Sequence, residues 1–199
     1  MLQINTKQNA TYKDVFNLIE EQSIKAKMLF IEAMYFEQYS EKTEEDSFFG
    51  IQSIDIEQIF LKLNHIIDLD SIILLWVTKE MLLLQLNTWI KKTNLKKVDF
   101  IFWKGRTRRT MKHVKDDCYL VFLAHKDNTN IENCTLNTIW EEMIDSNQSL
   151  YEKPLILQKN IIKVFSERDD IIVSISVRGS NIFKACLDLN RSLIGCSLQ

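Results

Sequence analysis

The sequence predicts a doubly wound α/β fold, in which one mostly parallel β-sheet carries helices on both faces. Three observations predict it. Short apolar runs alternate with amphipathic segments of about 10 to 15 residues. Several of those runs lack the polar alternation of a half-exposed strand, as is typical of strands buried on both faces. The 199 residues, 46% of them hydrophobic, suit one sizeable core, and no repeat or Pro- or Gly-rich linker divides them, so we expect a single domain over residues 1–199.

The N-terminal half is expected to hold two strands and three helices. Thr11, followed three positions later by Asp14, is a helix-capping pattern, and an apolar helical face follows it. The continuous apolar runs KMLFIEAMYF and SIILLWV indicate strands buried on both faces. The expected elements are helix 11–24, strand 27–36, helix 53–63, strand 71–77 and helix 79–93.

The C-terminal half continues the alternation. Pro154 suits the first turn of a helix, because its fixed φ angle fits there and its missing N–H is not needed. The expected elements are strand 96–104, strand 117–126, a short helix near 138–145, helix 154–166, strand 169–177, helix 181–189 and strand 192–198.

The composition argues against several classes of function. Glycine and proline are scarce, four and one in the chain, and no glycine-rich phosphate-binding pattern occurs. The four cysteines and three histidines are widely spaced with no C-x-x-C pair, so we expect buried thiols and no metal site. No apolar run is long enough for a membrane span, and the first residues lack the pattern of a secretory signal. We therefore expect no contact with a membrane.

One short segment carries the positive charge of a chain whose net charge is −2. Residues 104–115, KGRTRRTMKHVK, hold six cations and no acid, and we call them the basic loop. A solvated surface loop is one interpretation. The other is contact with nucleic-acid phosphates or with a partner protein, because each phosphate contact would release counterions. The six cations are Lys104, Arg106, Arg108, Arg109, Lys112 and Lys115.

Several motifs resemble, in order and spacing, the MT-A type adenine 6-amino methyltransferase family. The matching segments are L-W-V-T at 75–78, Trp89, V-D-F-I-F-W-K at 98–104, K-P at 153–154 and N-R-S-L-I-G at 190–195. The resemblance covers residues 27–199, and is closest to the non-catalytic subunit of the ciliate DNA 6-methyladenine methyltransferase complex. It implies a Rossmann-like methyltransferase domain of permuted motif order, with the catalytic strand first and the cofactor strand last.

The sequence departs from this family at the catalytic strand. Aligning segment 27–40 on the strand that ends in the family's Asp-Pro-Pro-Trp replaces the acid by Ala33, which has no side-chain acceptor for the amino group of a target base. The four degenerate positions are Ala33, Met34, Tyr35 and Phe36. We expect the two aromatic residues to pack in the core, with base stacking as the alternative. The Glu32 side chain should point to the opposite face from Ala33, because strand side chains alternate.

The cofactor segment, residues 169–199, departs from the family too. Ser174 replaces the acid of the family's Asp-Pro-Phe-x-Gly-Ser-Gly, Arg178 and Ser180 replace its two glycines, and Ser197 replaces the acid expected to hold the ribose hydroxyls. Losing two carboxylate acceptors costs about 1.5–3 kcal/mol each. We expect this chain to bind no cofactor.

The chain keeps the order and spacing of the family motifs but lacks the catalytic and cofactor-binding residues. Together these features predict a pseudo-enzyme. The resemblance implies a nuclear heterodimer with a catalytic paralogue that binds S-adenosylmethionine, so that this chain shapes the partner's site and contributes basic surface to a DNA substrate. The sequence leaves open whether further DNA-binding subunits take part. The alternatives are a silent subunit of an RNA adenine 6-methyltransferase and a divergent active methyltransferase.

Overall fold

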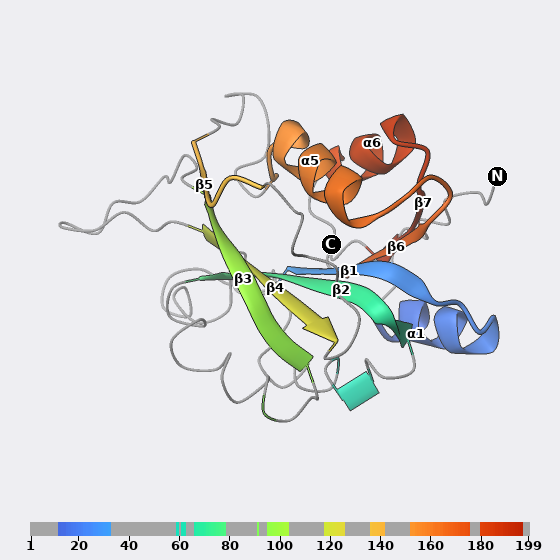
Figure 1. Cartoon of the computed structure of the whole chain (residues 1–199). Coiled ribbons are helices and arrows are strands. Elements are labelled where there is room, and N and C mark those ends of the chain that lie inside the picture. Colours follow the sequence, from blue (N-terminus) through green and yellow to red (C-terminus); the bar gives the residue numbers. More distant parts are fainter. Residues whose placement is uncertain are drawn as a thin grey trace, which may run out of the picture.

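The structure is a computed structural model of the chain, shown in Figure 1. It describes residues 12–32, 59, 61–62, 66–78, 91, 95–103, 118–125, 136–141, 152–175 and 180–196. None of the helices within these ranges is long and apolar enough to span a membrane.

The described strands form one seven-stranded sheet in the order β5-β3-β4-β2-β1-β6-β7. Their bounds are β1 Ala26–Glu32, β2 Ile67–Thr78, β3 Leu95–Trp103, β4 Cys118–His125, β5 Ile139–Trp140, β6 Ile171–Ile175 and β7 Ser192–Cys196. Within this sheet β4 runs antiparallel to both of its neighbours, and the other paired strands are parallel. The predicted α/β fold with a mostly parallel sheet is confirmed.

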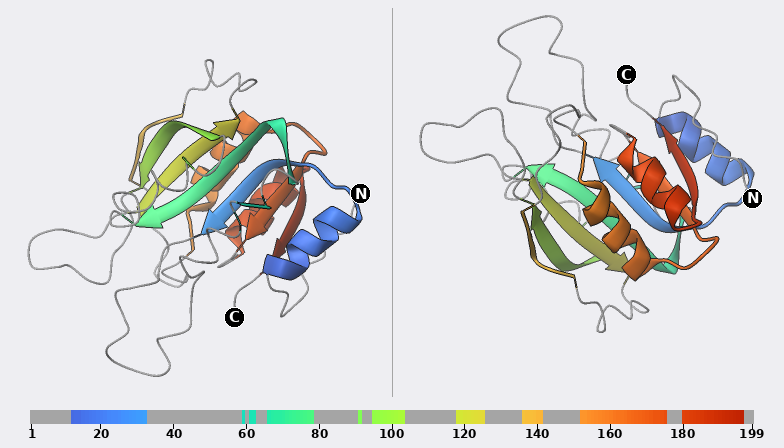
Figure 2. Two further views of the ribbon diagram at one scale, coloured as in Figure 1. Left: turned by 90° about the horizontal axis from the view of Figure 1, so that it is seen from below. Right: turned by 90° about the horizontal axis from the view of Figure 1, so that it is seen from above.

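Three described helices cover the two faces of the sheet: α1 (Tyr12–Glu21), α5 (Leu155–Phe165) and α6 (Asn181–Asp188). Figure 1 shows α5 and α6 on one face and α1 on the other, as a doubly wound fold requires. The two further views in Figure 2 show α5 and α6 side by side across the strands.

Alternation along the strands gives each face its own apolar layer. The layer under α5 and α6 contains Phe30 of β1, Trp76 of β2 and Ile172 of β6, which are buried together with Leu157 and Ile161 of α5. Leu29, Ile73 and Val173 occupy the alternate positions of the same strands and are fully buried as well. Burial on both faces explains why these strands read as continuous apolar runs in the sequence.

The structure contradicts one sequence-based element. The sequence predicts a short helix near 138–145, but Ile139 and Trp140 form the two-residue edge strand β5. The amide of Phe102 donates a 2.7 Å hydrogen bond to the carbonyl of Thr138, and residues 102 and 103 pair with 139 and 140. A β-branched residue and a tryptophan beside an open strand edge gain more from this pairing than from one turn of helix.

The other described elements agree with the expected ones except at their ends. Strand β2 begins at Ile67, four residues before the expected start, and β1 ends at Glu32 within the described residues. Residues 59, 61 and 62 are helical, as expected for helix 53–63, and so is Lys91 within the expected helix 79–93. The remaining residues of these two expected helices lie outside the described residues.

Candidate functional site at the carboxyl ends of β1 and β6

The sheet has its topological switch point between β1 and β6. From β1 the chain continues to β2 on one side, and from β6 it continues through α6 to β7 on the other side. In open α/β sheets, ligands bind outside the carboxyl ends of the strands at such a point, because the two connections diverge there and leave a crevice. The candidate site therefore lies beyond Glu32, the last residue of β1, and Ile175, the last residue of β6.

Both segments that the sequence singles out start at this end of the sheet. The degenerate catalytic positions Ala33, Met34, Tyr35 and Phe36 follow β1 directly, and Arg178 lies three residues after β6. Together with Ser197 they lie outside the described residues. Because β1 and β6 are hydrogen-bonded parallel neighbours, with Phe30 in register with Ser174, the two segments leave the sheet at the same edge.

Two of the four degenerate cofactor positions, Ser174 and Ser180, lie within the described residues. Ser174 is buried in β6 at 2% exposure, on the face of the sheet that α5 and α6 cover. Its hydroxyl stands where the family resemblance places a carboxylate. Ser180 precedes α6 as its N-cap residue, is exposed, and makes no side-chain capping bond to the helix. The structure thus places these two residues at the two ends of the β6–α6 connection.

A carboxylate from elsewhere in the chain caps α6. Glu152 Oε1 accepts hydrogen bonds from the backbone N–H of Ser180 at 2.8 Å and of Asn181 at 2.9 Å, and from Ser180 Oγ at 3.3 Å. Glu152 is 7% exposed. Anionic groups are favoured at a helix N-terminus, where free N–H groups and the helix dipole converge. Sequence reasoning missed Glu152, although it directly precedes the K-P motif of Lys153 and Pro154.

Lys153, which directly follows Glu152, contacts the last residue of β1. Its Nζ lies 3.3 Å from Glu32 Oε2 and 5.3 Å from the centroid of the Trp76 ring, and the Lys153 side chain is fully buried. Glu32 and Trp76 are register partners on adjacent strands, so a single ammonium contacts both. The Glu32 side chain, which the sequence places opposite Ala33, lies on the face covered by α5 and α6. It is held by a cation instead of facing open solvent.

The basic loop begins at the same edge of the sheet. Its cations, Lys104, Arg106, Arg108, Arg109, Lys112 and Lys115, lie outside the described residues, but the loop follows Trp103, the last residue of β3. Trp103 is 3% exposed and meets Trp76 edge to face, with ring centroids 6.0 Å apart and planes at 76°. The end of β3, which leads into the basic loop, therefore packs against Trp76, the residue whose ring contacts Lys153.

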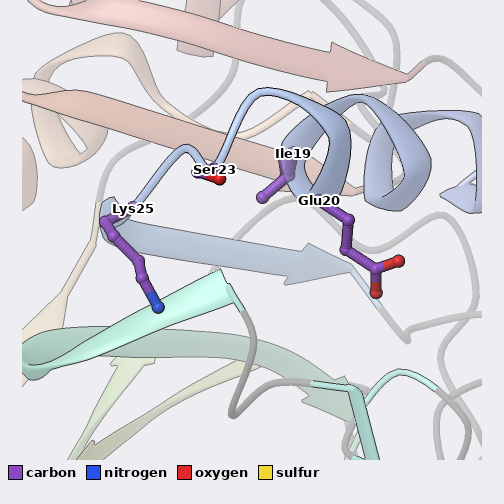
Figure 3. Close-up of a pocket in the computed structure, with 4 residues that line it drawn as sticks. All are labelled: Ile19, Glu20, Ser23 and Lys25. Atoms are coloured by element: carbon purple, nitrogen blue, oxygen red, sulfur yellow. The ribbon is translucent and has the colours of Figure 1, made fainter.

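A shallow pocket lies at the other end of the sheet. Figure 3 shows its described lining residues, Ile19 and Glu20 on α1, Ser23 after the helix, and Lys25 directly before β1. This pocket is at the amino end of β1, away from the switch point. We place the candidate site at the carboxyl ends and not at this pocket, because ligands of open α/β sheets bind at the carboxyl ends of the strands.

Comparisons with solved structures show proteins of the same fold. M1.HpyAVI bound to SAM superposes with a TM-score of 0.71 at 14% sequence identity, covering 100% of this chain and 94% of that one. The cytosine-N4-specific PvuII DNA methyltransferase superposes with a TM-score of 0.69 at 11% identity, covering 96% and 80%. The chain has a class I methyltransferase fold.

Sequence similarity to known proteins is low. No family model matches the chain. The type II methyltransferase M.HhaII from Haemophilus parahaemolyticus is 27% identical over 151 residues, which is 72% of this chain and 65% of that protein. The match thus spans slightly less than two thirds of its relative. The chain thus resembles a type II methyltransferase in sequence as well as the methyltransferases above in fold.

At the switch point, the charged side chains of Glu32, Glu152 and Lys153 contact other groups of the chain itself. The ammonium of Lys153 contacts Glu32, and the first amides of α6 contact Glu152. Asn181 Nδ2 also donates a 2.9 Å hydrogen bond to the carbonyl of Lys153, which ties the segment to α6 a second time. Charges and donors that could hold a bound ligand are here used to join β1, α6 and residues 152–154.

Proposed function

We propose that this chain is a catalytically silent methyltransferase-like subunit that pairs with an active paralogue and supports 6-methylation of adenine in DNA. The observation that carries the proposal is the sequence that follows β1. Where an adenine methyltransferase of the resembled family has Asp-Pro-Pro-Trp, this chain has Ala33, Met34, Tyr35 and Phe36. A methyl group cannot accept the hydrogen bond that holds an exocyclic amine.

The cofactor positions support the same proposal. The hydroxyl of Ser174 replaces a carboxylate next to the switch point, and Ser197 replaces a second one after β7. A neutral hydroxyl gives a weaker hydrogen bond than a carboxylate, and each lost charged acceptor costs about 1.5–3 kcal/mol. S-adenosylmethionine is then bound by the partner subunit and not by this chain.

The basic loop supports a role in substrate binding. Its anchor, Trp103, ends β3 at the same sheet edge as the carboxyl ends of β1 and β2, because β3 and β2 are both antiparallel to β4. DNA phosphates near the partner's site would meet the cations of residues 104–115 at this edge. Such contacts position DNA without reading its sequence. Nuclear location, the heterodimer and further DNA-binding subunits belong to the proposal through the family resemblance.

Reconstitution with the paralogue tests the proposal. The chain is used as bait in a native extract of its source organism, and the captured methyltransferase is then produced with and without it. We expect methyl transfer to adenine in DNA only when both chains are present. Transfer of a labelled methyl group to any oligonucleotide by this chain alone would overturn the proposal.

The same assay compares DNA with RNA oligonucleotides of matched sequence. Greater methylation of DNA supports the proposed substrate. Preference for RNA would make the chain a silent subunit of an RNA methyltransferase instead.

A second candidate is an active methyltransferase with a divergent site, which the similarity to M.HhaII and to the SAM complex of M1.HpyAVI favours. Calorimetric titration of the isolated chain with S-adenosylmethionine separates the two. Micromolar binding would support the active enzyme. Absence of binding supports the silent subunit.

A further inference from the structure

Residues 152–154 lie across the switch point on the α5 and α6 side, and we call them the strap. At one end Lys153 Nζ pairs with Glu32, which ends β1. At the other end Glu152 and the Lys153 carbonyl bind the first residues of α6, which follow the β6 connection. The strap thus joins the end of β1 to the start of α6, the helix that follows β6 in the chain.

Glu152 has the surroundings of a bound anion. One oxygen, Oε1, accepts two backbone N–H groups and a hydroxyl, all from the residues that start α6. The carboxylate belongs to a residue 28 positions earlier in the chain, so it is not the local cap that begins most helices. Its side chain is buried, and so is its hydrogen bond with the amide of Asn181, which limits competition from water at that bond.

We propose that Glu152 is a built-in ligand: its carboxylate occupies the anion position at the N-terminus of α6, so that the domain folds without a cofactor and excludes the carboxylate of S-adenosylmethionine from that position. This inference rests on the proposed silent subunit and adds a physical cause for its silence. Missing cofactor residues weaken binding, whereas the Glu152 carboxylate blocks it. The two causes can be separated, because the block is removed by changing a single side chain.

Chemical rescue of Glu152→Ala tests the inference. The substitution removes the carboxylate and leaves space at the two amides, so the melting temperature of the isolated chain should fall by about 4–10 °C. Acetate at about 0.1 M should then restore a substantial part of the loss, because a ligand that binds only the folded state raises its stability. Sodium chloride at equal ionic strength should not, and the wild-type chain should respond to the two salts alike.

S-adenosylmethionine is the second probe. We expect calorimetry to detect binding to Glu152→Ala at least tenfold tighter than to the wild-type chain. Glu152→Gln keeps the acceptor oxygen and the shape, so it provides a folded variant with a weakened block if the alanine variant does not fold. Glu167→Ala is the matched control, since Glu167 is an exposed glutamate in the loop after α5.

The outcomes separate this inference from the proposed function. If folded Glu152→Ala shows neither acetate rescue nor a gain in S-adenosylmethionine affinity, Glu152 is a structural cap only and the inference is wrong. If only Glu152→Gln folds, the absence of a gain in S-adenosylmethionine affinity has the same meaning. The silent subunit is unaffected by that result. Micromolar binding of S-adenosylmethionine by the wild-type chain would instead overturn the proposed function as well.

Discussion

Lys153 Nζ lies 3.3 Å from Glu32 Oε2 in the interior, with 0% of the lysine side chain and 10% of the glutamate side chain exposed. The two residues are separated by 121 positions in the sequence, and the ion pair fastens the segment before α5 to the end of β1. The ring of Trp76 adds a cation–π contact to the same ammonium. The pair therefore fixes the strand end from which the degenerate catalytic segment leaves.

Removing one partner of this pair should destabilise the fold strongly. Lys153→Met leaves the Glu32 carboxylate buried without its cation, and we expect a loss of about 3–5 kcal/mol in the free energy of unfolding, measured by urea titration. The double variant Glu32→Gln/Lys153→Met should lose less than Lys153→Met alone, because no uncompensated charge is left. If the loss in the double variant equalled the sum of the losses in Lys153→Met and Glu32→Gln, the two residues would not be a coupled pair.

The ion pair between Lys159 of α5 and Asp188 of α6 provides the control. Its side chains are 33% and 49% exposed, so water screens the charges. Lys159→Met should change the free energy of unfolding by no more than about 1 kcal/mol.

The buried thiol of Cys186 should make stability fall at high pH. Burial raises the pKa of Cys186 from 9.0 to about 12, and the nearby Arg191 guanidinium lowers it only in part. Below pH 9 the thiol is protonated in both the folded and the unfolded chain. Between pH 9 and 12 only the unfolded chain ionises, so the free energy of unfolding should drop by about 1.4 kcal/mol per pH unit from this group.

Two measurements check the Cys186 prediction. Cys186→Ala should remove that part of the slope when urea titrations are compared between pH 8.5 and 10.5. Alkylation followed by peptide mapping should leave Cys186 unmodified in the folded wild-type chain at pH 8, and modify it after denaturation. Rapid labelling of the folded chain at Cys186 would show that the thiol is accessible.

Arg191 joins the end of α5 to the start of β7. Its Nε donates to Ser166 Oγ at 3.1 Å, and its two terminal nitrogens donate to the carbonyls of Ser166 and Leu189. Lysine has one donor group and cannot reproduce this fork, so Arg191→Lys should cost about 1–3 kcal/mol in urea titration. Arg168→Lys, at an exposed arginine of the neighbouring loop, should be within about 0.5 kcal/mol of wild type.

Charge reversal in the basic loop tests its role in substrate binding. Replacing Arg106, Arg108 and Arg109 by glutamate should weaken DNA binding by the reconstituted pair. The plot of log affinity against log salt should become less steep by about 0.9 for each DNA phosphate that the loop no longer neutralises. Fluorescence anisotropy over a salt series measures both quantities.

A control variant keeps the same change in net charge on another surface. Lys163, Arg168 and Lys184 are exposed on or near α5 and α6, and their replacement by glutamate should alter the salt slope less than reversal in the basic loop. Equal effects of the two triple variants would assign DNA binding to overall charge and not to residues 104–115.

The sequence alone determined the layered architecture. Continuous apolar runs such as the one ending in β1 predict strands buried on both faces, because local patterning is enough to distinguish them from amphipathic helices. It also placed Ser174 and Ser180 in a strand and at the start of a helix, where the structure has them. The positions after β1 and in the basic loop stay predictions, because they lie outside the described residues.

Only the tertiary structure decided which groups meet. Glu32 and Lys153, and Glu152 and the amide of Asn181, are brought together by the parallel pairing of β1 with β6 and by the packing of α5 beside α6. No local pattern encodes such contacts, because they join segments 29 and 121 residues apart through the register of the sheet. Ile139 and Trp140 likewise became an edge strand and not a helix, because the open edge of β3 offered partners that their own sequence does not specify.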